Sequence, residues 1–225
     1  MQNVRSLAAL ALVLFLSPVA ASAEEQPELI VGGLVGALRG WSVFCKDYPS
    51  ECEVLHEQKI KLDLNVATLK ILNEVNVHVN SSVQFKTDIE HWGTRDPRYT
   101  FDVLGSPGVD KWDFAEDGFG DCEDYANLKK KMLIDKGFPR SALLLTVVSV
   151  PNREPDVKTS SKNERHMVLM VRTNQGDLIL DYPDATNDIL PWYSTEGYEY
   201  ESRQSQEDPN VWVALSMPTV ADVTK

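Results

Sequence analysis

Apolar residues recur at helical spacing in two segments of the chain. In the first segment, positions 62, 66, 69, 72, 75 and 79 are apolar, which predicts a helix from Leu62 to Val79. The second segment runs from Asp121 to Lys136 and carries the clearest helical pattern in the sequence. Its residues Tyr125, Leu128 and Met132 are spaced to form one buried stripe.

The second helix also has signals at both of its ends. Asp121 is a residue type that caps helix N-termini, and Asp124 follows it three residues later. Gly137 and Pro139 supply the stop signal at the other end. We therefore expect Cys122 to be the first residue inside this helix.

Apolar, β-branched runs follow the second helix and predict strands. They cover Leu143 to Val150, His166 to Arg172, Asp177 to Tyr182 and Val211 to Met217. A tight turn at residues 173–176 joins the second and third runs. Three other segments are expected to be a long ordered loop or surface loops: Ser81 to Gly120, Pro151 to Glu164 and Glu199 to Pro209. Helices followed by an antiparallel sheet predict an α+β domain.

The first 23 residues have the organisation of a secretory signal peptide. Arg5 is followed by an apolar run from Leu7 to Leu16, and residues 21–23 form an Ala-Ser-Ala cleavage site. No later segment holds about 18 consecutive apolar residues, so we expect no membrane insertion of the mature chain. Residues 24–225 are long enough for a single domain with its own core.

The chain is acidic, with a formal net charge of −12. Such a charge disfavours nucleic acid and anionic lipid as partners. One short basic run, Lys129 to Lys131, lies within the second predicted helix and is expected to be a solvated face.

The sequence holds three cysteines: Cys45, Cys52 and Cys122. Export to an oxidising compartment permits a disulfide between Cys45 and Cys52. The alternative is two free buried cysteines, because closeness in sequence does not determine the geometry that a disulfide needs. If the first two pair, Cys122 is the odd thiol, which makes it a candidate nucleophile.

The position of Cys122 favours that chemistry. Unsatisfied backbone N–H groups at a helix start stabilise a thiolate and can receive an oxyanion. A nucleophilic cysteine also needs a base and a third group that orients the base. Of the four histidines, only His166 opens a predicted strand directly after a polar loop. Asp181 lies near the end of the next strand.

The hairpin between the two strands decides whether His166 and Asp181 meet. A two-residue loop at Asn174 and Gln175 pairs Asp181 with Val168, which makes Asp181 the diagonal neighbour of His166 on one sheet face. An odd-numbered loop without a bulge puts the two residues on opposite faces. The spacing permits a Cys-His-Asp triad, and the alternative is a buried thiol, a surface histidine and an unrelated aspartate.

Several segments together resemble the bacterial transglutaminase-like cysteine proteinase family. They are Gly120-Asp-Cys-Glu-Asp-Tyr-Ala126, Arg165-His-Met-Val-Leu169, Ile179-Leu-Asp181, Phe44 to Cys52 and His91-Trp-Gly93. The resemblance runs from about Trp41 to Trp192. It implies a papain-like, transglutaminase-type core, with a nucleophile at a helix N-terminus packed on an antiparallel sheet.

The resemblance implies a role for each residue of the triad. Cys122 matches the nucleophile, His166 the general base and acid, and Asp181 the orienting carboxylate. The sequence departs from the family pattern at two positions that flank the triad. Met167 stands where a small residue is usual, and Tyr182 stands where an asparagine is usual. Both departures are expected to affect the substrate channel.

The activity implied is that of a periplasmic cysteine peptidase that forms a thioester acyl-enzyme. Its partners would be a protein or peptide substrate, such as a cell-surface protein, and a regulatory membrane receptor. Two alternatives stay open. The same triad serves a transglutaminase or amidase, and the same fold serves a binding module without turnover.

Acidic residues crowd the candidate nucleophile. Asp121, Glu123 and Asp124 surround Cys122 in sequence, and their charges oppose a thiolate. No cofactor is required for the chemistry, but a hard cation such as Ca²⁺ would offset these charges. In relatives, calcium binds through acids at the positions of Asp121 and Glu123. The alternative is that these acids only cap and solvate the helix.

Overall fold

The computed structural model describes residues 27–54, 60–93, 110–151, 163–182 and 187–219. The predicted signal peptide, residues 1–23, lies outside the described residues, as does most of the predicted loop between positions 151 and 164. Among the helices described, none is both long and apolar enough to cross a membrane.

A seven-stranded antiparallel sheet forms the centre of the fold. Its strand order is β1-β9-β8-β4-β5-β6-β7. The strands are β1 (Ile30–Val35), β4 (Leu143–Pro151), β5 (Asn163–Val171), β6 (Leu178–Leu180), β7 (Leu190–Pro191), β8 (Glu199–Gln204) and β9 (Trp212–Ser216). Two short strands, β2 (Gln84–Phe85) and β3 (Phe119–Gly120), pair in parallel as a separate sheet.

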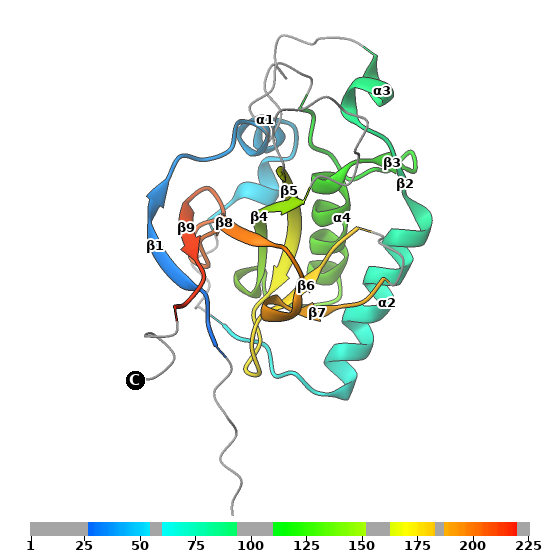
Figure 1. Cartoon of the computed structure of the whole chain (residues 1–225). Coiled ribbons are helices and arrows are strands. Elements are labelled where there is room, and N and C mark those ends of the chain that lie inside the picture. The colour runs from blue at the N-terminus through cyan, green and yellow to red at the C-terminus, as the bar shows by residue number, and fades with distance from the viewer. Residues whose placement is uncertain (1–26, 55–59, 94–109, 152–162, 183–186, 220–225) are drawn as a thin grey trace, which may run out of the picture.

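The helices pack around this sheet (Figure 1). The α-helices are α1 (Arg39–Asp47), α2 (Val66–Ser82), α3 (Asp88–Trp92) and α4 (Cys122–Asp135), and there are short 3₁₀ helices at Pro49–Cys52, Arg140–Ala142 and Trp192–Ser194. Helix α4 lies between β5 and α2 (Figure 1). Its Tyr125 and Leu133 enter the main core with Leu145 and Leu169 of the sheet. The predicted α+β architecture is therefore confirmed.

Both predicted helices are present, and one begins later than expected. Helix α4 starts at Cys122 with Asp121 as its N-cap, as predicted. Helix α2 starts at Val66 because Asn65 caps it, its Oδ1 accepting from the N–H of Thr68 at 3.0 Å. Leu62 is not helical. Its N–H donates instead to the carbonyl of Arg172 at 2.9 Å, beside the β5–β6 hairpin.

The prediction of a loop from Glu199 to Pro209 is wrong, because residues 199–204 form β8. This strand lies between β4 and β9, and its polar side chains find partners inside the fold. Gln204 is fully buried, and its Oε1 accepts from Nζ of Lys130 at 2.6 Å and from the N–H of Leu145 at 3.2 Å. A polar strand without alternation gives no sequence signal for burial.

The prediction of a solvated face for Lys129 to Lys131 on α4 is wrong for two of the three lysines. Lys129 is 0% exposed and Lys130 is 5% exposed. Each buried amine has an acceptor, which a buried amine requires. Lys129 donates to the main-chain carbonyl of Asp181, and Lys130 donates to Gln204.

The N-terminal part of the domain packs on the segment that precedes Cys122. Trp41 and Phe44 of α1 contact Trp112 and Phe114, respectively. The disulfide between Cys45 and Cys52 is present, with Cα atoms 5.6 Å apart, and it ties α1 to the following 3₁₀ helix. Neither α1 nor β1 was expected from the hydrophobic pattern.

Gly40 permits the close contact between α1 and Trp112. A β-carbon at Gly40 would lie 2.1 Å from Nε1 of Trp112, whose ring is buried. We therefore expect Gly40→Ala to destabilise the protein by about 1–3 kcal/mol, as overpacked cores do. Gly33→Ala in β1 is the matched control, since a β-carbon there meets nothing within 4 Å. Denaturant unfolding of both variants checks this, and equal midpoints would contradict it.

Candidate active site

Glycines and a short sheet position Cys122. The carbonyl of Gly120 accepts from the N–H of Lys86 at 2.9 Å, and that of Gly118 accepts from Gln84 at 2.8 Å. A β-carbon at Gly120 would lie 2.7 Å from that of Asp124, so a larger residue does not fit in this turn. The main chain then enters α4, and Cys122 is its first residue and a free, half-buried thiol.

His166 and Asp181 meet in the way that a two-residue hairpin loop predicts. The pairs Leu169–Leu180 and Val171–Leu178 set the register of β5 and β6, and the same register puts Asp181 opposite Val168. Nε2 of His166 lies 2.6 Å from Oδ1 of Asp181. His166 is 5% exposed, so this hydrogen bond is shielded from water. The hairpin therefore has the register of a two-residue loop, not that of an odd-numbered loop, and His166 and Asp181 are in contact.

Asp181 accepts hydrogen bonds from four other groups as well. Its carboxylate accepts from the N–H of Tyr182 at 2.7 Å and from the hydroxyl of Tyr198. Its main-chain carbonyl accepts from Nδ2 of Asn80 at 3.1 Å and from Nζ of Lys129. No sequence pattern indicates Tyr198, Lys129 or Asn80 as partners of Asp181, because these contacts cross between elements that are distant in the chain.

The electrostatics favour a charged imidazole. Burial alone lowers the pKa of His166, but the charge of Asp181, the hydrogen bond to it and the interaction with Cys122 raise that pKa to about 10. Burial raises the pKa of Asp181, but His166, Tyr198 and Lys129 lower that pKa by a larger amount, so the net shift is downward. The two side chains therefore form an ion pair, with Cys122 next to the imidazolium.

Aromatic side chains border His166. The ring of Tyr182 meets the imidazole edge-on at 5.0 Å, and Phe85 stacks on Tyr182 at 5.5 Å. Phe85 is 46% exposed, so this side of the site is accessible. Of the two departures from the family pattern, only Tyr182 lies at the site. Met167 is buried in the main core, because side chains on a strand alternate and His166 precedes it.

Three carboxylates converge beside Cys122. Asp88, Asp121 and Glu123 each offer an oxygen within 4.8 Å of the others. The sequence predicts Asp121 and Glu123, and the tertiary structure adds Asp88 from α3. Oε2 of Glu123 also lies 3.1 Å from Sγ of Cys122, so the cluster touches this thiol directly.

These carboxylates are poorly compensated. Burial and the neighbouring charge of Asp121 raise the pKa of Asp88 to about 8, and burial raises that of Asp121 to about 6. Burial and Asp121 also raise the pKa values of Glu123 and Asp124. Oδ1 of Asp121 is buried without a hydrogen-bond partner among the described residues. An all-oxygen donor set with an unused buried oxygen fits a hard cation such as Ca²⁺.

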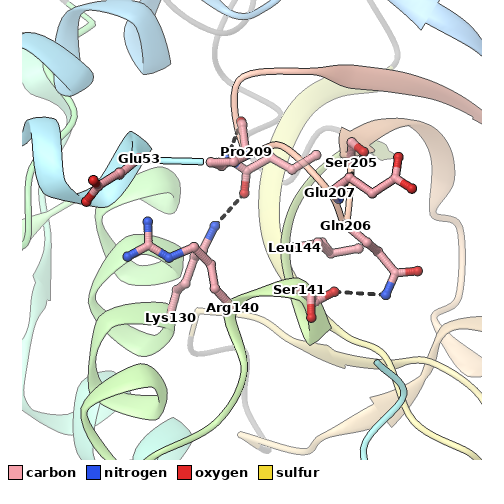
Figure 2. Close-up of a pocket in the computed structure, with 10 residues that line it drawn as sticks. Glu53, Lys130, Arg140, Ser141, Leu144, Ser205, Gln206, Glu207 and Pro209 are labelled. Carbon is pink, nitrogen blue, oxygen red and sulfur yellow. Dashed lines mark hydrogen bonds between the residues drawn. The ribbon is translucent and has the colours of Figure 1, made fainter. Parts of the chain in front are cut away.

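A cavity on another part of α4 does not include these residues (Figure 2). Its lining includes Lys130, Arg140, Gln204 and Gln206. Much of its polar lining is paired internally, as in the bond from Nε2 of Gln206 to the carbonyl of Ser141 at 2.9 Å (Figure 2). We therefore place the candidate active site at Cys122, not here.

The chain is similar to three solved structures of LapG from Legionella pneumophila. The calcium-bound structure is 25% identical, with a TM-score of 0.47, covering 68% of this chain and 72% of LapG. A second LapG structure is 26% identical (TM-score 0.46, covering 65% and 68%). The EGTA-treated structure is 23% identical (TM-score 0.45, covering 67% and 72%). No curated protein sequence matches the chain significantly.

A family model gives the decisive comparison. The model of the bacterial transglutaminase-like cysteine proteinases, BTLCP, matches residues 32–219. The match covers the segment around Cys122, the β5–β6 hairpin and nearly all of the described fold. This chain therefore belongs to the bacterial transglutaminase-like cysteine proteinase family and is a cysteine peptidase.

Proposed function

We propose that the chain is an exported, periplasmic cysteine peptidase that cuts protein substrates with Cys122, His166 and Asp181. The observation that carries the proposal is the partly buried 2.6 Å contact between His166 and Asp181, together with the interaction of His166 with a free cysteine at a helix start. Export rests on the signal-peptide pattern of residues 1–23.

The mechanism is acyl transfer through a thioester. The Cys122 thiolate attacks the peptide carbonyl, and backbone N–H groups at the start of α4 stabilise the oxyanion. Because Nε2 of His166 is engaged by Asp181, Nδ1 is the nitrogen that faces the reaction. It donates its proton to the departing amine. His166 then takes a proton from water, whose oxygen attacks the thioester and releases the acid and the thiolate.

The same three residues serve transamidation, if an amine rather than water attacks the thioester. Incorporation of an added primary amine into product distinguishes that activity from hydrolysis. A cell-surface protein as substrate and a membrane receptor as regulator are part of the proposal, and both rest on the family resemblance alone.

Calcium binding is also part of the proposal. Asp88, Asp121 and Glu123 would hold the ion, and Oδ1 of Asp121 is the oxygen without another partner. A bound cation would supply positive charge beside the thiolate. Without one, these carboxyls must share protons or repel each other, which disfavours a negative sulfur next to them.

Alkylation by iodoacetamide tests the triad without a known substrate. We expect Cys122 to be alkylated rapidly at pH 7 and Cys122→Ser to remain unlabelled. His166→Ala should be alkylated at least about tenfold more slowly, since only the thiolate reacts. His78→Ala is the matched control, because His78 is exposed on α2. Mass spectrometry measures the rates. Equal rates in wild type and His166→Ala would remove the thiolate–imidazolium pair from the mechanism.

The pKa of His166 makes a second expectation. NMR titration should give a midpoint near pH 10, falling toward the ordinary value of about 6.5 in Asp181→Asn. Since the folded pKa lies above the unfolded one, protonated His166 stabilises the fold fully below about pH 6.5. That contribution is lost as the pH rises toward 10. Peptidase activity should also fall as the pH rises toward 10, because His166, the general acid, loses its proton. A wild-type midpoint near 6.5 would contradict the ion pair.

Calcium should bind and stabilise the wild type. At a concentration 100 times its dissociation constant, Ca²⁺ adds about 2.7 kcal/mol to the free energy of unfolding. Asp88→Asn should weaken binding in calorimetry and reduce the rise in melting temperature. Asp135→Asn is the control, since Asp135 pairs with Lys131 at the far end of α4. A melting temperature that EGTA and Ca²⁺ leave unchanged would count against the site.

A further inference from the structure

Asp181 lies one residue beyond the end of β6, which ends at Leu180. Its side chain is held by His166 and Tyr198, but the ladder between β5 and β6 does not extend to it. Its main-chain carbonyl is held from two helices instead. Lys129 of α4 donates its Nζ, and Asn80 of α2 donates its Nδ2 at 3.1 Å.

Lys129 is placed to connect Cys122 with Asp181. It follows Cys122 by seven residues, about two helical turns, so the two residues lie near the same face of α4. Lys129 is fully buried, and its amine faces Asp181 and, at 6.0 Å, the ring of Tyr125. Burying an amine is costly unless it is well paired, so Lys129 is stable at this position only because its amine has a partner in Asp181.

The charges agree with this arrangement. Burial lowers the pKa of Lys129 to about 7, and the charge of Asp181 opposes that shift. In the other direction, Lys129 is one of the groups that keep the pKa of Asp181 low, after His166 and Tyr198. The amine therefore acts on the carboxylate electrostatically as well as on the carbonyl by hydrogen bonding.

The neighbouring Lys130 shows that burial on α4 does not by itself explain the contact. Lys130 is almost as buried, and burial also lowers its pKa to about 7. Its amine, however, donates to Gln204, and Lys130 lines the cavity of Figure 2, whose lining includes no residue of the triad. The chain thus carries two adjacent buried lysines, of which one touches Asp181.

We propose that Lys129, together with Asn80, is a positioning residue that ties the main chain of Asp181 to the helix that carries Cys122. The nucleophile and the orienting carboxylate then keep one geometry, and His166 is aligned between them. The inference rests on the proposed triad. Neither Lys129 nor Asn80 touches the reacting atoms.

The test compares Lys129→Met with Lys130→Met in the mature protein. Met keeps most of the length of each side chain and removes only the amine. We expect Lys129→Met to alkylate with iodoacetamide at pH 7 about tenfold more slowly, because small misplacements of catalytic groups are costly. The imidazole Nε2 proton signal of His166, measured by NMR on ¹⁵N-histidine-labelled protein, should shift or broaden. Lys130→Met should keep both the rate and the signal.

A second variant keeps the proposal testable if Lys129→Met does not fold. Asn80→Leu removes the other donor to the same carbonyl and should move both readouts in the same direction by a smaller amount. If Lys129→Met does not fold, Asn80→Leu carries the test. Folded Lys129→Met or Asn80→Leu protein with the wild-type rate and the wild-type His166 signal would overturn the inference.

Asp181→Asn separates this inference from the proposed function. If Asp181→Asn slows alkylation and removes the His166 signal while Lys129→Met and Asn80→Leu change neither, the triad stands and the positioning role fails. If Asp181→Asn itself has no effect, the proposed triad fails, and the positioning role fails with it.

Discussion

The partly buried hydrogen bond between His166 and Asp181 is the interaction on which the site depends. It joins β5 to the residue that follows β6, and it converts a histidine that burial would leave neutral into an imidazolium. A buried charge of this kind persists only when its partner is well held. Five donors around Asp181 supply that hold: His166, the N–H of Tyr182, Tyr198, Lys129 and Asn80.

Helix α4 carries most of the remaining constraints. Its first residue is Cys122, its first turn contains Glu123 and Asp124, and its later turns hold two buried lysines. It packs on β5, which carries His166, and on α2, which carries Asn80. A displacement of α4 would therefore disturb Cys122, the acid cluster and the support of Asp181 together.

The acid cluster and the ion pair act on Cys122 in opposite directions. The imidazolium stabilises a thiolate, whereas Glu123, in direct contact with the sulfur, opposes it. The buried carboxyls shift their pKa values upward because they are crowded and shielded from water. The balance between the two effects depends on what neutralises the carboxylates, so a cation bound at this position would directly influence the reactivity of Cys122.

The sequence by itself determined the parts of the protein that depend on local chemistry. The cap and stop residues of α4 placed Cys122 at a helix start, and these signals lie within a few residues of the helix ends, so a pattern is enough to read them. The turn at residues 173–176 located the hairpin, but the structure decided the register that brings His166 and Asp181 together. The family resemblance rests on these same segments.

Only the tertiary structure decided which distant groups complete the site. Asp88 joins Asp121 and Glu123 because α3 packs beside the start of α4. Lys129 and Lys130 can be buried because other elements supply acceptors for their amines. Strand β8 is polar along its length, and only its place between two strands turns it into a core element. The physical reason is common to all three cases. A polar side chain is stable inside a protein when it has a hydrogen-bond or ionic partner. Its neighbours in sequence do not indicate which distant residue will be that partner.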